Sequence, residues 1–215
     1  DHDASELRFT PEAVVIAQGE EDVARLLTLA NRYRFPVIPR GGATGLAGGC
    51  LAVNGGVVLS LERMHRILAI ASVALVAEVE PGVITLDLRR AVEEQGLYYP
   101  PDPAGMDRST IGGNAATGAG GPSCLKYGVT KDYILGLDVV LPTGQKIRTG
   151  TRTRKGVVGY DLTHLLVGSE GTLGVITGLT LKLIPKPPAA AALAASFPDL
   201  ASAMHTVNAI MMSGH

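Results

Sequence analysis

The first part of the chain contains an apolar run and, after it, a segment whose apolar residues recur at helical spacing. Residues 11–17 contain an apolar run of strand length. Between residues 21 and 34, apolar side chains recur with the spacing of one helix face, at Val23, Leu26, Leu27 and Ala30. Pro36 ends that helix, and residues 35–38 read as a second strand. The pattern therefore predicts a strand, a helix and a strand in succession.

The pattern downstream predicts further elements and one long irregular segment. We expect strands at residues 54–61, 74–80, 134–141, 145–148, 173–184 and 191–197, and helices at residues 85–95, at residues 162–167 and from residue 199 onward. The turn at residues 142–144 makes a hairpin of the strands beside it. Residues 100–130 are rich in Gly, Pro, Ser and Thr and have little periodicity. A loop of this length in a compact domain is usually functional or disordered.

The prolines within residues 185–188 are the clearest boundary signal in the sequence. They predict a first domain at residues 1–186 and the beginning of a second domain at residues 187–215. The second part would hold one strand and a helix opened by Asp199, which is too little to build a core. The sequence also lacks an initiator Met. We therefore expect a fragment or a trimmed chain, truncated before the rest of a second domain.

Composition and charge exclude several classes of protein. The chain has 215 residues, of which 46% are hydrophobic and 4% aromatic, and this suits an alanine- and valine-rich α/β protein with a substantial core. Lys and Arg number 19 against 20 Asp and Glu, so a basic surface for nucleic acid is not indicated. No apolar run reaches membrane-spanning length, and no signal peptide is recognisable. We expect no nucleic-acid partner and no membrane span.

The cysteines and histidines suggest no metal site. Cys50 and Cys124 form no C-x-x-C motif; a reduced, cytoplasmic compartment is the simplest interpretation, although two cysteines leave a disulfide open. The histidines lack the spacing of metal ligands. For His65 and His164, which lie in apolar periodic segments, we expect structural or surface roles rather than that of a catalytic base. A small buried thiol is the expected role of Cys124.

The most informative motif is the loop at residues 39–49, which holds five glycines and one arginine after a short apolar strand. Glycine lets a ligand approach the backbone, so such a loop can turn its N–H groups toward a phosphate. In a Rossmann or P-loop turn the glycines lead directly into a helix. Here a strand at residues 54–61 follows, and neither consensus fits. The loop is therefore expected to bind phosphate without a helix dipole.

Three more segments are rich in glycine, at residues 109–121, 126–128 and 168–177. The first offers many backbone amides with Ser, Thr and Asn groups, which could bind a polar ring edge, a ribityl chain or phosphate oxygens. The last carries Glu170 at a turn before a strand, where it could meet ribose hydroxyls. Each segment taken alone is explained more readily by turns, helix ends and bulges.

Taken together and in order, the segments resemble a known family. They read PRGGATGLAGG, PPDPAG, STIGGNAATGAGG, KYG and GSEGTLGVIT, and they are similar to the FAD-binding domain of the vanillyl-alcohol oxidase / PCMH-type flavoprotein superfamily. Within it they most resemble the branch of D-lactate dehydrogenase, D-2-hydroxyglutarate dehydrogenase and the glycolate oxidase subunit. The resemblance covers about residues 11–186. It implies an α+β fold of two α/β subdomains, one around a small mixed sheet and one around an antiparallel sheet, with FAD between them.

The resemblance also implies which residues bind the cofactor. The FAD pyrophosphate would be contacted by Pro39, Arg40, Gly41, Gly42, Ala43, Thr44, Gly45 and Leu46. Beside the pyrophosphate and the flavin would lie Asp102, Ser109, Thr110, Ile111, Gly112, Gly113 and Asn114, with Thr117, Gly118 and Gly120 near them. The adenosine end would be held by Glu170, Gly171, Gly174 and Ile176. An arginine in this position can touch a phosphate or equally well pair with a carboxylate.

Two departures from the family pattern matter. Gly118 stands where this branch usually has Asn, so one side-chain contact would be lost while the backbone remains. Relatives with covalently held flavin carry a His in or near the first glycine loop, whereas here Leu46 follows Gly45. The resemblance therefore implies non-covalent FAD.

The implied activity is the oxidation of a D-2-hydroxy acid of the glycolate or D-lactate type, by hydride transfer to flavin N5. No nucleophile elbow is present, which suits an enzyme whose flavin carries the redox chemistry. In this branch, most residues that grip the substrate carboxylate and take the hydroxyl proton belong to a C-terminal cap domain. No catalytic residue is therefore predicted among residues 1–215, and the chain alone is expected to turn over poorly.

Two alternatives remain open from the sequence. The chain could be a non-catalytic FAD-binding subunit that works with a separate substrate-binding or electron-transfer partner, for example an iron–sulfur protein. It could also belong to another reductase of the same superfamily, such as the cell-wall precursor reductase, which uses NADPH.

Overall fold

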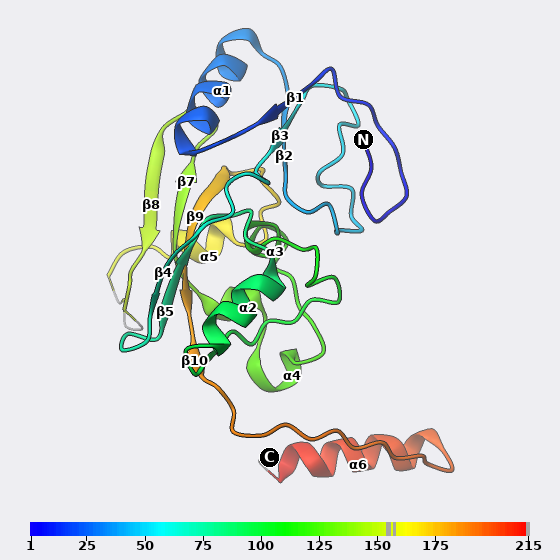
Figure 1. Cartoon of the computed structure of the whole chain (residues 1–215). Coiled ribbons are helices and arrows are strands. Elements are labelled where there is room, and N and C mark those ends of the chain that lie inside the picture. The colour runs from blue at the N-terminus through cyan, green and yellow to red at the C-terminus, as the bar shows by residue number, and fades with distance from the viewer. Residues whose placement is uncertain (154–155, 157, 214–215) are drawn as a thin grey trace.

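The computed structural model describes residues 1–153, 156 and 158–213 and contains two main β-sheets (Figure 1). The smaller sheet has the strand order β1-β3-β2 and consists of β1 (Ala13–Ile16), β2 (Val37–Arg40) and β3 (Val57–Ser60). The expectation of a mixed sheet here is wrong, because both strand pairs are parallel. Helix α1 (Glu20–Tyr33) makes the crossover from β1 to β2. The crossover from β2 to β3 is the glycine loop with the residues that follow it.

The larger sheet is antiparallel and has the strand order β4-β5-β9-β7-β8. Its strands are β4 (Ile67–Ala71), β5 (Val76–Val79), β7 (Ile134–Val140), β8 (Lys146–Gly150) and β9 (Val175–Lys182). The predicted hairpin is confirmed as β7 and β8. Strand β9 lies in the centre and is buried along almost its whole length, as its apolar sequence requires. A further pair joins β6 (Leu97–Tyr98) to β10 (Ile184–Pro185). The sequence pattern missed β4 and β6, and its single strand at residues 173–184 is divided into β9 and β10.

Helices cover the larger sheet. Its core joins the sheet residues Leu137 and Leu181 to Leu88 of α2 (Thr85–Glu93), Ile111 of α3 (Ile111–Thr117) and Leu166 of α5 (Leu162–Leu166). The expectation of one long irregular loop at residues 100–130 is wrong in part, because α3 and α4 (Cys124–Tyr127) lie within it and the 3₁₀ helix η1 (Thr130–Tyr133) begins at its end; the residues between these helices are irregular. All three helices are short, and α3 is rich in Gly and Ala. They form because tertiary packing overrides low helix propensity.

Helix α1 joins the two sheets into one framework. Its apolar face packs in a second core cluster, which also contains Val140 of β7 and Val175 of β9. Polar contacts lie beside this cluster: Lys146 of β8 forms an ion pair with Glu21 at 2.6 Å, and the Thr177 hydroxyl of β9 donates to the carboxylate of Glu20 at 3.0 Å. The parallel sheet is therefore held, through α1, against the end of the antiparallel sheet where β7 finishes and β9 begins.

The C-terminal segment makes little contact with this framework. The strand predicted at residues 191–197 is wrong: the stretch is exposed coil, and it pairs with no strand in the part of the chain that is described. The helix predicted after Asp199 is confirmed as α6 (Leu200–Met212), and Asp199 caps it by accepting a hydrogen bond from the Ser202 N–H. Helix α6 has no buried residue, and it lies apart from both sheets in Figure 1. Residues 214 and 215 lie outside the described residues.

Candidate functional site

A cavity of about 490 Å³ is lined by residues that belong to both sheets and the segments around them. The parallel sheet supplies the end of β2 and the glycine loop. The other side supplies residues 103–105, one face of α3, the turn at Glu170 and the beginning of β9. Three segments that are far apart in the sequence therefore meet around one hollow.

The backbone of the glycine loop is free to bind a ligand. Among the described residues, the N–H groups from Gly41 to Ala47 donate no hydrogen bond, although most backbone donors in folded proteins have a partner. Ala43 has a φ of 53°, a left-handed conformation that is uncommon for a residue other than glycine. Successive N–H groups in such a turn can converge on one anion. The loop thus has the donors that a phosphate requires.

Two glycines let this loop pack closely against the segment before α3. A Cβ on Gly41 would lie 2.5 Å from the Thr110 hydroxyl oxygen, and a Cβ on Gly42 would overlap the carbonyl oxygen of Arg108. Larger residues at either position would push the loop away from the opposite wall. Both glycines are therefore explained by close approach as well as by ligand access.

The N-terminus of α3 faces the same cavity, but its first N–H groups already have partners. The Ile111 N–H donates to the Val83 carbonyl and the Gly112 N–H to the Pro81 carbonyl, both at 2.8 Å. The Gly113 N–H donates to the hydroxyl of Thr110, the N-cap, at 3.1 Å. The first N–H groups of α3 are thus engaged, whereas those from Gly41 to Ala47 donate no hydrogen bond within the described chain; anion binding by the loop without a helix end stays a prediction.

A buried polar network fixes α3 in place. Asn114 donates to the Thr85 hydroxyl at 2.7 Å, and Thr85 shares a hydrogen bond with the Ser109 hydroxyl at 2.9 Å. All three residues are at least 95% buried. Their side chains are engaged with one another, so Ser109 and Asn114 contribute to the cavity wall mainly by holding its shape.

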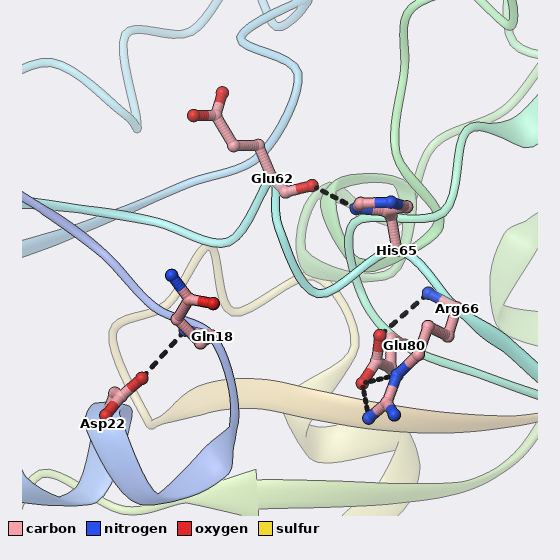
Figure 2. A network of polar contacts seen from close by, with 6 residues as sticks. All are labelled: Gln18, Asp22, Glu62, His65, Arg66 and Glu80. Atoms are coloured by element: carbon pink, nitrogen blue, oxygen red, sulfur yellow. Dashed lines mark hydrogen bonds and ion pairs between the residues drawn. The ribbon is translucent and has the colours of Figure 1, made fainter.

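Pro81 lines the cavity, and the preceding residue, Glu80, forms an ion pair with Arg66 (Figure 2). Glu80 is 5% exposed and accepts hydrogen bonds from the Arg66 side chain at 2.7 and 3.1 Å and from the Arg66 N–H at 2.8 Å. Burial opposes ionisation of Glu80, but the bonds and charge of Arg66 outweigh burial and hold the pKa of the carboxyl below its usual value. Figure 2 shows Arg66 folded over this carboxylate.

Arg40 and Glu170 bring opposite charges to the lining. The Arg40 guanidinium donates to the His2 carbonyl at 2.7 Å and contacts the Cys50 sulfur at 3.7 Å; no carboxylate of the described chain lies within ion-pair distance of it. Glu170 has a φ of 50°, and its N–H is bonded to the Ala116 carbonyl of α3 at 2.8 Å. Its turn is thereby fixed to α3, and its carboxylate lies against Gly49.

Most of the residues expected to bind the cofactor come together here. The lining contains Pro39, Arg40, Gly41, Gly42, Ala43, Thr44, Gly45, Leu46, Ser109, Thr110, Gly112, Gly113, Asn114, Thr117, Glu170, Gly171, Gly174 and Ile176. It does not contain Asp102, Ile111, Gly118 or Gly120. Ile111 is a core residue. Asp102 instead accepts hydrogen bonds from the Ser123 N–H and hydroxyl.

Gly118 and Gly120 lie near the lining without forming part of it. Gly118 ends α3 with a φ of 63°, and Gly120 packs close to the Cys124 sulfur. Direct cofactor contact by Asp102, Ile111, Gly118 and Gly120 stays a prediction, and the structure gives each of them a local role in the fold.

Sequence reasoning missed several lining residues. The Pro103-Ala104-Gly105 stretch belongs to the PPDPAG segment, from which Asp102 alone was selected, so the motif itself was the available signal. Asp3, Cys50, Leu61 and Pro81 also line the cavity. Cys50 directly follows the glycine loop, whereas nothing in the local pattern indicates the position of Asp3, Leu61 and Pro81.

The histidines within the described residues lie outside the lining. His164 Nδ1 contacts the Asp161 carboxylate at 2.5 Å and its Nε2 the Lys131 carbonyl at 3.1 Å, so it links α5 to η1. His65 contacts the Glu62 carbonyl at 3.0 Å (Figure 2). Within residues 1–153, 156 and 158–213, no group of three or more His, Cys, Asp and Glu side chains could hold a metal ion, and no helix is long and apolar enough to cross a membrane.

Comparison with known sequences gives close matches. A family profile described as an FAD binding domain matches residues 11–150. The glycolate oxidase subunit GlcD of Bacillus subtilis is 49% identical over 201 residues, which are 94% of this chain and 43% of that protein. A D-lactate dehydrogenase of Anaerostipes hadrus is 44% identical over 202 residues, which are 94% of this chain and 42% of that protein. The chain spans less than half the length of these relatives.

Solved structures with a similar fold support the same comparison. An alkyldihydroxyacetonephosphate synthase aligns with a TM-score of 0.78 and 29% identity, over 94% of this chain and 40% of that chain. The 6-hydroxy-D-nicotine oxidase of Arthrobacter nicotinovorans aligns with a TM-score of 0.70 and 26% identity, over 83% of this chain and 38% of that chain. The α+β fold expected from the sequence motifs is confirmed.

Proposed function

The chain belongs to the family of FAD-binding domains, and from this premise we propose that it is the cofactor-holding part of a flavin-dependent dehydrogenase for a D-2-hydroxy acid. FAD is the cofactor of the family. The substrate class is inferred from the printed names of the relatives, glycolate oxidase subunit and D-lactate dehydrogenase. The single observation that carries the proposal is the set of unpartnered N–H groups from Gly41 to Ala47 around the cavity.

The residues present fit FAD. A dinucleotide needs donors for its pyrophosphate, and the glycine loop has them in consecutive positions. Arg40 at the end of β2 adds a positive charge that no described carboxylate neutralises by an ion pair. Glu170, on the opposite wall, has the acceptor oxygens that ribose hydroxyls require. When bound, FAD would supply the hydride acceptor in its flavin ring.

The protein's own contribution is to bind and orient the cofactor. The loop would hold the pyrophosphate, the wall formed by residues 109–117 would lie along the flavin side, and the turn at Glu170 would hold the adenosine side. The charged and thiol side chains of the described lining are Asp3, Arg40, Cys50 and Glu170, and no histidine is among them. The proton of the substrate hydroxyl is therefore expected to be taken by a residue outside this lining.

We expect FAD to be held without a covalent bond. The described lining has no histidine, and burial raises the pKa of the Cys50 thiol despite the nearby charge of Arg40, so this thiol is a weak nucleophile. Denaturation with trichloroacetic acid should release all the flavin into the supernatant. Flavin retained on the precipitated protein would contradict this expectation.

The division into domains, the cellular location and the electron-transfer partner are part of the same proposal. Residues 1–186 would form the FAD-binding domain: Lys186 still contacts it through an ion pair with Glu93 at 2.9 Å and a bond from its N–H to the Gly96 carbonyl. Residues 187–215 would begin the cap domain that meets the substrate, and the exposed apolar side chains of α6 support this. We propose a cytoplasmic location and an electron-transfer partner.

Two experiments test the proposal. Purified chain is titrated with FAD and followed by flavin fluorescence; binding with quenching is expected, and the absence of any flavin binding would contradict the cofactor assignment for this chain. In the full-length protein, anaerobic mixing with D-lactate or glycolate should bleach the flavin absorbance near its oxidised maximum. Bleaching by NADPH and not by either hydroxy acid would instead favour the reductase alternative.

A second candidate is a subunit that holds FAD for a separate partner. It is favoured by the word subunit in the name of the Bacillus subtilis relative and by the lack of a histidine in the described lining. The two candidates separate in one assay. A full-length protein that oxidises the hydroxy acid with an artificial electron acceptor, without any added protein, would exclude the non-catalytic role.

A further inference from the structure

The first ten residues, called here the N-terminal arm (residues 1–10), form a small closed loop beside the glycine loop. A β-bridge between His2 and Arg8 and a hydrogen bond from the Phe9 N–H to the Asp1 carbonyl at 2.8 Å close it. Figure 1 shows the arm next to the coil that follows β2. The arm precedes residues 11–150, the part that matches the family profile, so that match assigns it no role.

The arm contacts the glycine loop at two places. The Arg40 guanidinium, at the beginning of the loop, donates to the His2 carbonyl at 2.7 Å. The Ala4 N–H donates to the Gly45 carbonyl at 3.2 Å. These bonds use a carbonyl and a side chain of the loop and leave the N–H groups from Gly41 to Ala47 free.

Asp3 lies between these two contacts. It is 5% exposed and lines the cavity. Its Oδ1 accepts hydrogen bonds from the Ser5 N–H at 2.9 Å and the Ser5 hydroxyl at 2.5 Å. Its Oδ2 is buried without a well-formed hydrogen bond in the described chain. Burial opposes ionisation, but the bonds from Ser5, the Gly48 N–H and the charge of Arg40 together hold the pKa of Asp3 below its usual value.

We infer that Asp3 is a positioning residue, through which the N-terminal arm holds the glycine loop in the shape that receives the FAD pyrophosphate. The inference rests on the proposed function in one respect, that the ligand of the loop is FAD. A loop whose own N–H groups are unpartnered has few internal bonds to fix it, so contacts from outside must do so. Fixing the loop before binding removes part of the ordering cost that binding would otherwise carry.

The test compares variants of the full 215-residue chain. Asp3→Ala removes the buried carboxylate, and Asp3→Asn keeps an oxygen for Ser5 but removes the charge beside Arg40. Glu6→Gln removes an exposed carboxylate from the same arm and is the matched control. Two properties are measured: FAD affinity by fluorescence titration, and the rate of tryptic cleavage after Arg40 without FAD. Thermal unfolding of each variant reports the stability of the rest of the fold.

Asp3→Ala should weaken FAD binding about tenfold and speed cleavage after Arg40 by a similar factor, which is the size expected for the loss of a buried charge-assisted contact. Asp3→Asn should fall between Asp3→Ala and the wild type, and Glu6→Gln should match the wild type. Wild-type cleavage and affinity in Asp3→Ala would overturn the inference. So would equal acceleration of cleavage at all sites, because it means general unfolding.

The readout without FAD separates this inference from the proposed function. If the wild-type chain binds no FAD, the cofactor assignment fails for this chain. The cleavage comparison still decides whether Asp3 orders the glycine loop.

Discussion

Gly42 is the residue at which the glycine loop comes closest to the opposite wall. The space that a side chain would need is taken by the carbonyl oxygen of Arg108, a backbone atom that cannot rotate away. Gly45, three positions later, has nothing within 4 Å of the position that a Cβ would occupy. A glycine at position 42 is therefore explained by close packing, and the glycine at position 45 by access for a ligand.

The substitution Gly42→Ala should destabilise the chain by roughly 1–3 kcal/mol, because it overpacks the contact with the Arg108 carbonyl. FAD affinity should fall as well, since the loop must move away from the wall. Gly45→Ala is the matched control and should leave the stability of the FAD-free chain close to that of the wild type. Chemical denaturation of both variants measures the difference. Equal stabilities would mean that the loop adapts to a side chain at Gly42.

Glu80 gives a prediction about pH. Its pKa is lowered in the folded chain, as burial is outweighed by the bonds from Arg66, so its contribution to stability is present above its unfolded pKa and is lost as the pH falls through its folded pKa. Glu80→Gln should therefore cost about 1 kcal/mol at pH 7, and the deficit should shrink in acid below pH about 4. Denaturation curves at pH 7 and at lower pH measure this.

The control for Glu80 is Glu62→Gln, since Glu62 is exposed and its contact to His65 uses the backbone carbonyl (Figure 2). This variant should change stability little at either pH. A deficit for Glu80→Gln that stays constant down to a pH of about 3, below the usual pKa of a glutamate, would show that the charge of Glu80 is not the source of its effect.

At the scale of elements, a helix or strand could be predicted where its apolar residues form a clear period or run, and not where they do not. Helix α1 and strand β9 have strong apolar periods or runs, and both were located from the sequence. Helix α3 was not, because its sequence IGGNAAT has almost no period and its position depends on Thr85, which lies far away in the chain. Strand β4 was missed because its outer face is exposed and its pairing with β5 is irregular.

The candidate site shows the same division. The order of the glycine-rich motifs predicted that the glycine loop, the segment of α3 and the turn at Glu170 belong to one site. Segments that bind a ligand through their backbone tend to be rich in glycine, so they can be recognised in a sequence. Asp3 and Pro81 line the cavity because the fold brings distant segments of the chain together. The sequence around each residue cannot indicate this position. The family resemblance placed Asp102 beside the pyrophosphate and the flavin, but in the structure its carboxylate accepts hydrogen bonds from Ser123.

A substitution at Thr85 tests whether its hydrogen bonds with Asn114 and Ser109 support FAD binding. Thr85→Val removes the hydroxyl that joins Asn114 to Ser109 and should cost about 1–3 kcal/mol, because buried polar groups lose a partner. FAD affinity should fall at the same time. Thr163→Val is the matched control: its hydroxyl is also buried and donates to the Thr149 hydroxyl at 2.9 Å, away from the cavity. It should cost stability and leave FAD affinity unchanged, and a similar affinity loss in both would contradict a specific role for the network.

At the scale of the whole molecule, the two sheets supply opposite walls of one cavity. Their relative position is set by α1, whose apolar face packs with Val140 and Val175 of the antiparallel sheet. The polar contacts of Lys146 beside this core are exposed, and such pairs contribute little to stability. The apolar junction is therefore the part that keeps the walls at a fixed separation.

Leu27→Ala, at this junction, should lower the free energy of unfolding by about 2–4 kcal/mol and weaken FAD binding, because the walls are no longer held together. Leu29→Ala is the control on the same helix, since Leu29 is 47% exposed and Leu27 is 7% exposed. It should change stability by less than about 1 kcal/mol. Denaturation and FAD titration of both variants test this; an unchanged affinity in a destabilised Leu27→Ala chain would mean that the walls are held by other contacts.

The crossover from β2 to β3 has a consequence for the cell. Parallel strands are usually joined through a helix, which satisfies its own backbone; here the connecting N–H groups from Gly41 to Ala47 donate no hydrogen bond within the described chain. On the proposed function, FAD binding would fix this loop, so proteases should cleave it faster in the FAD-free protein than in the FAD-bound protein. Bound FAD should therefore slow degradation of the protein.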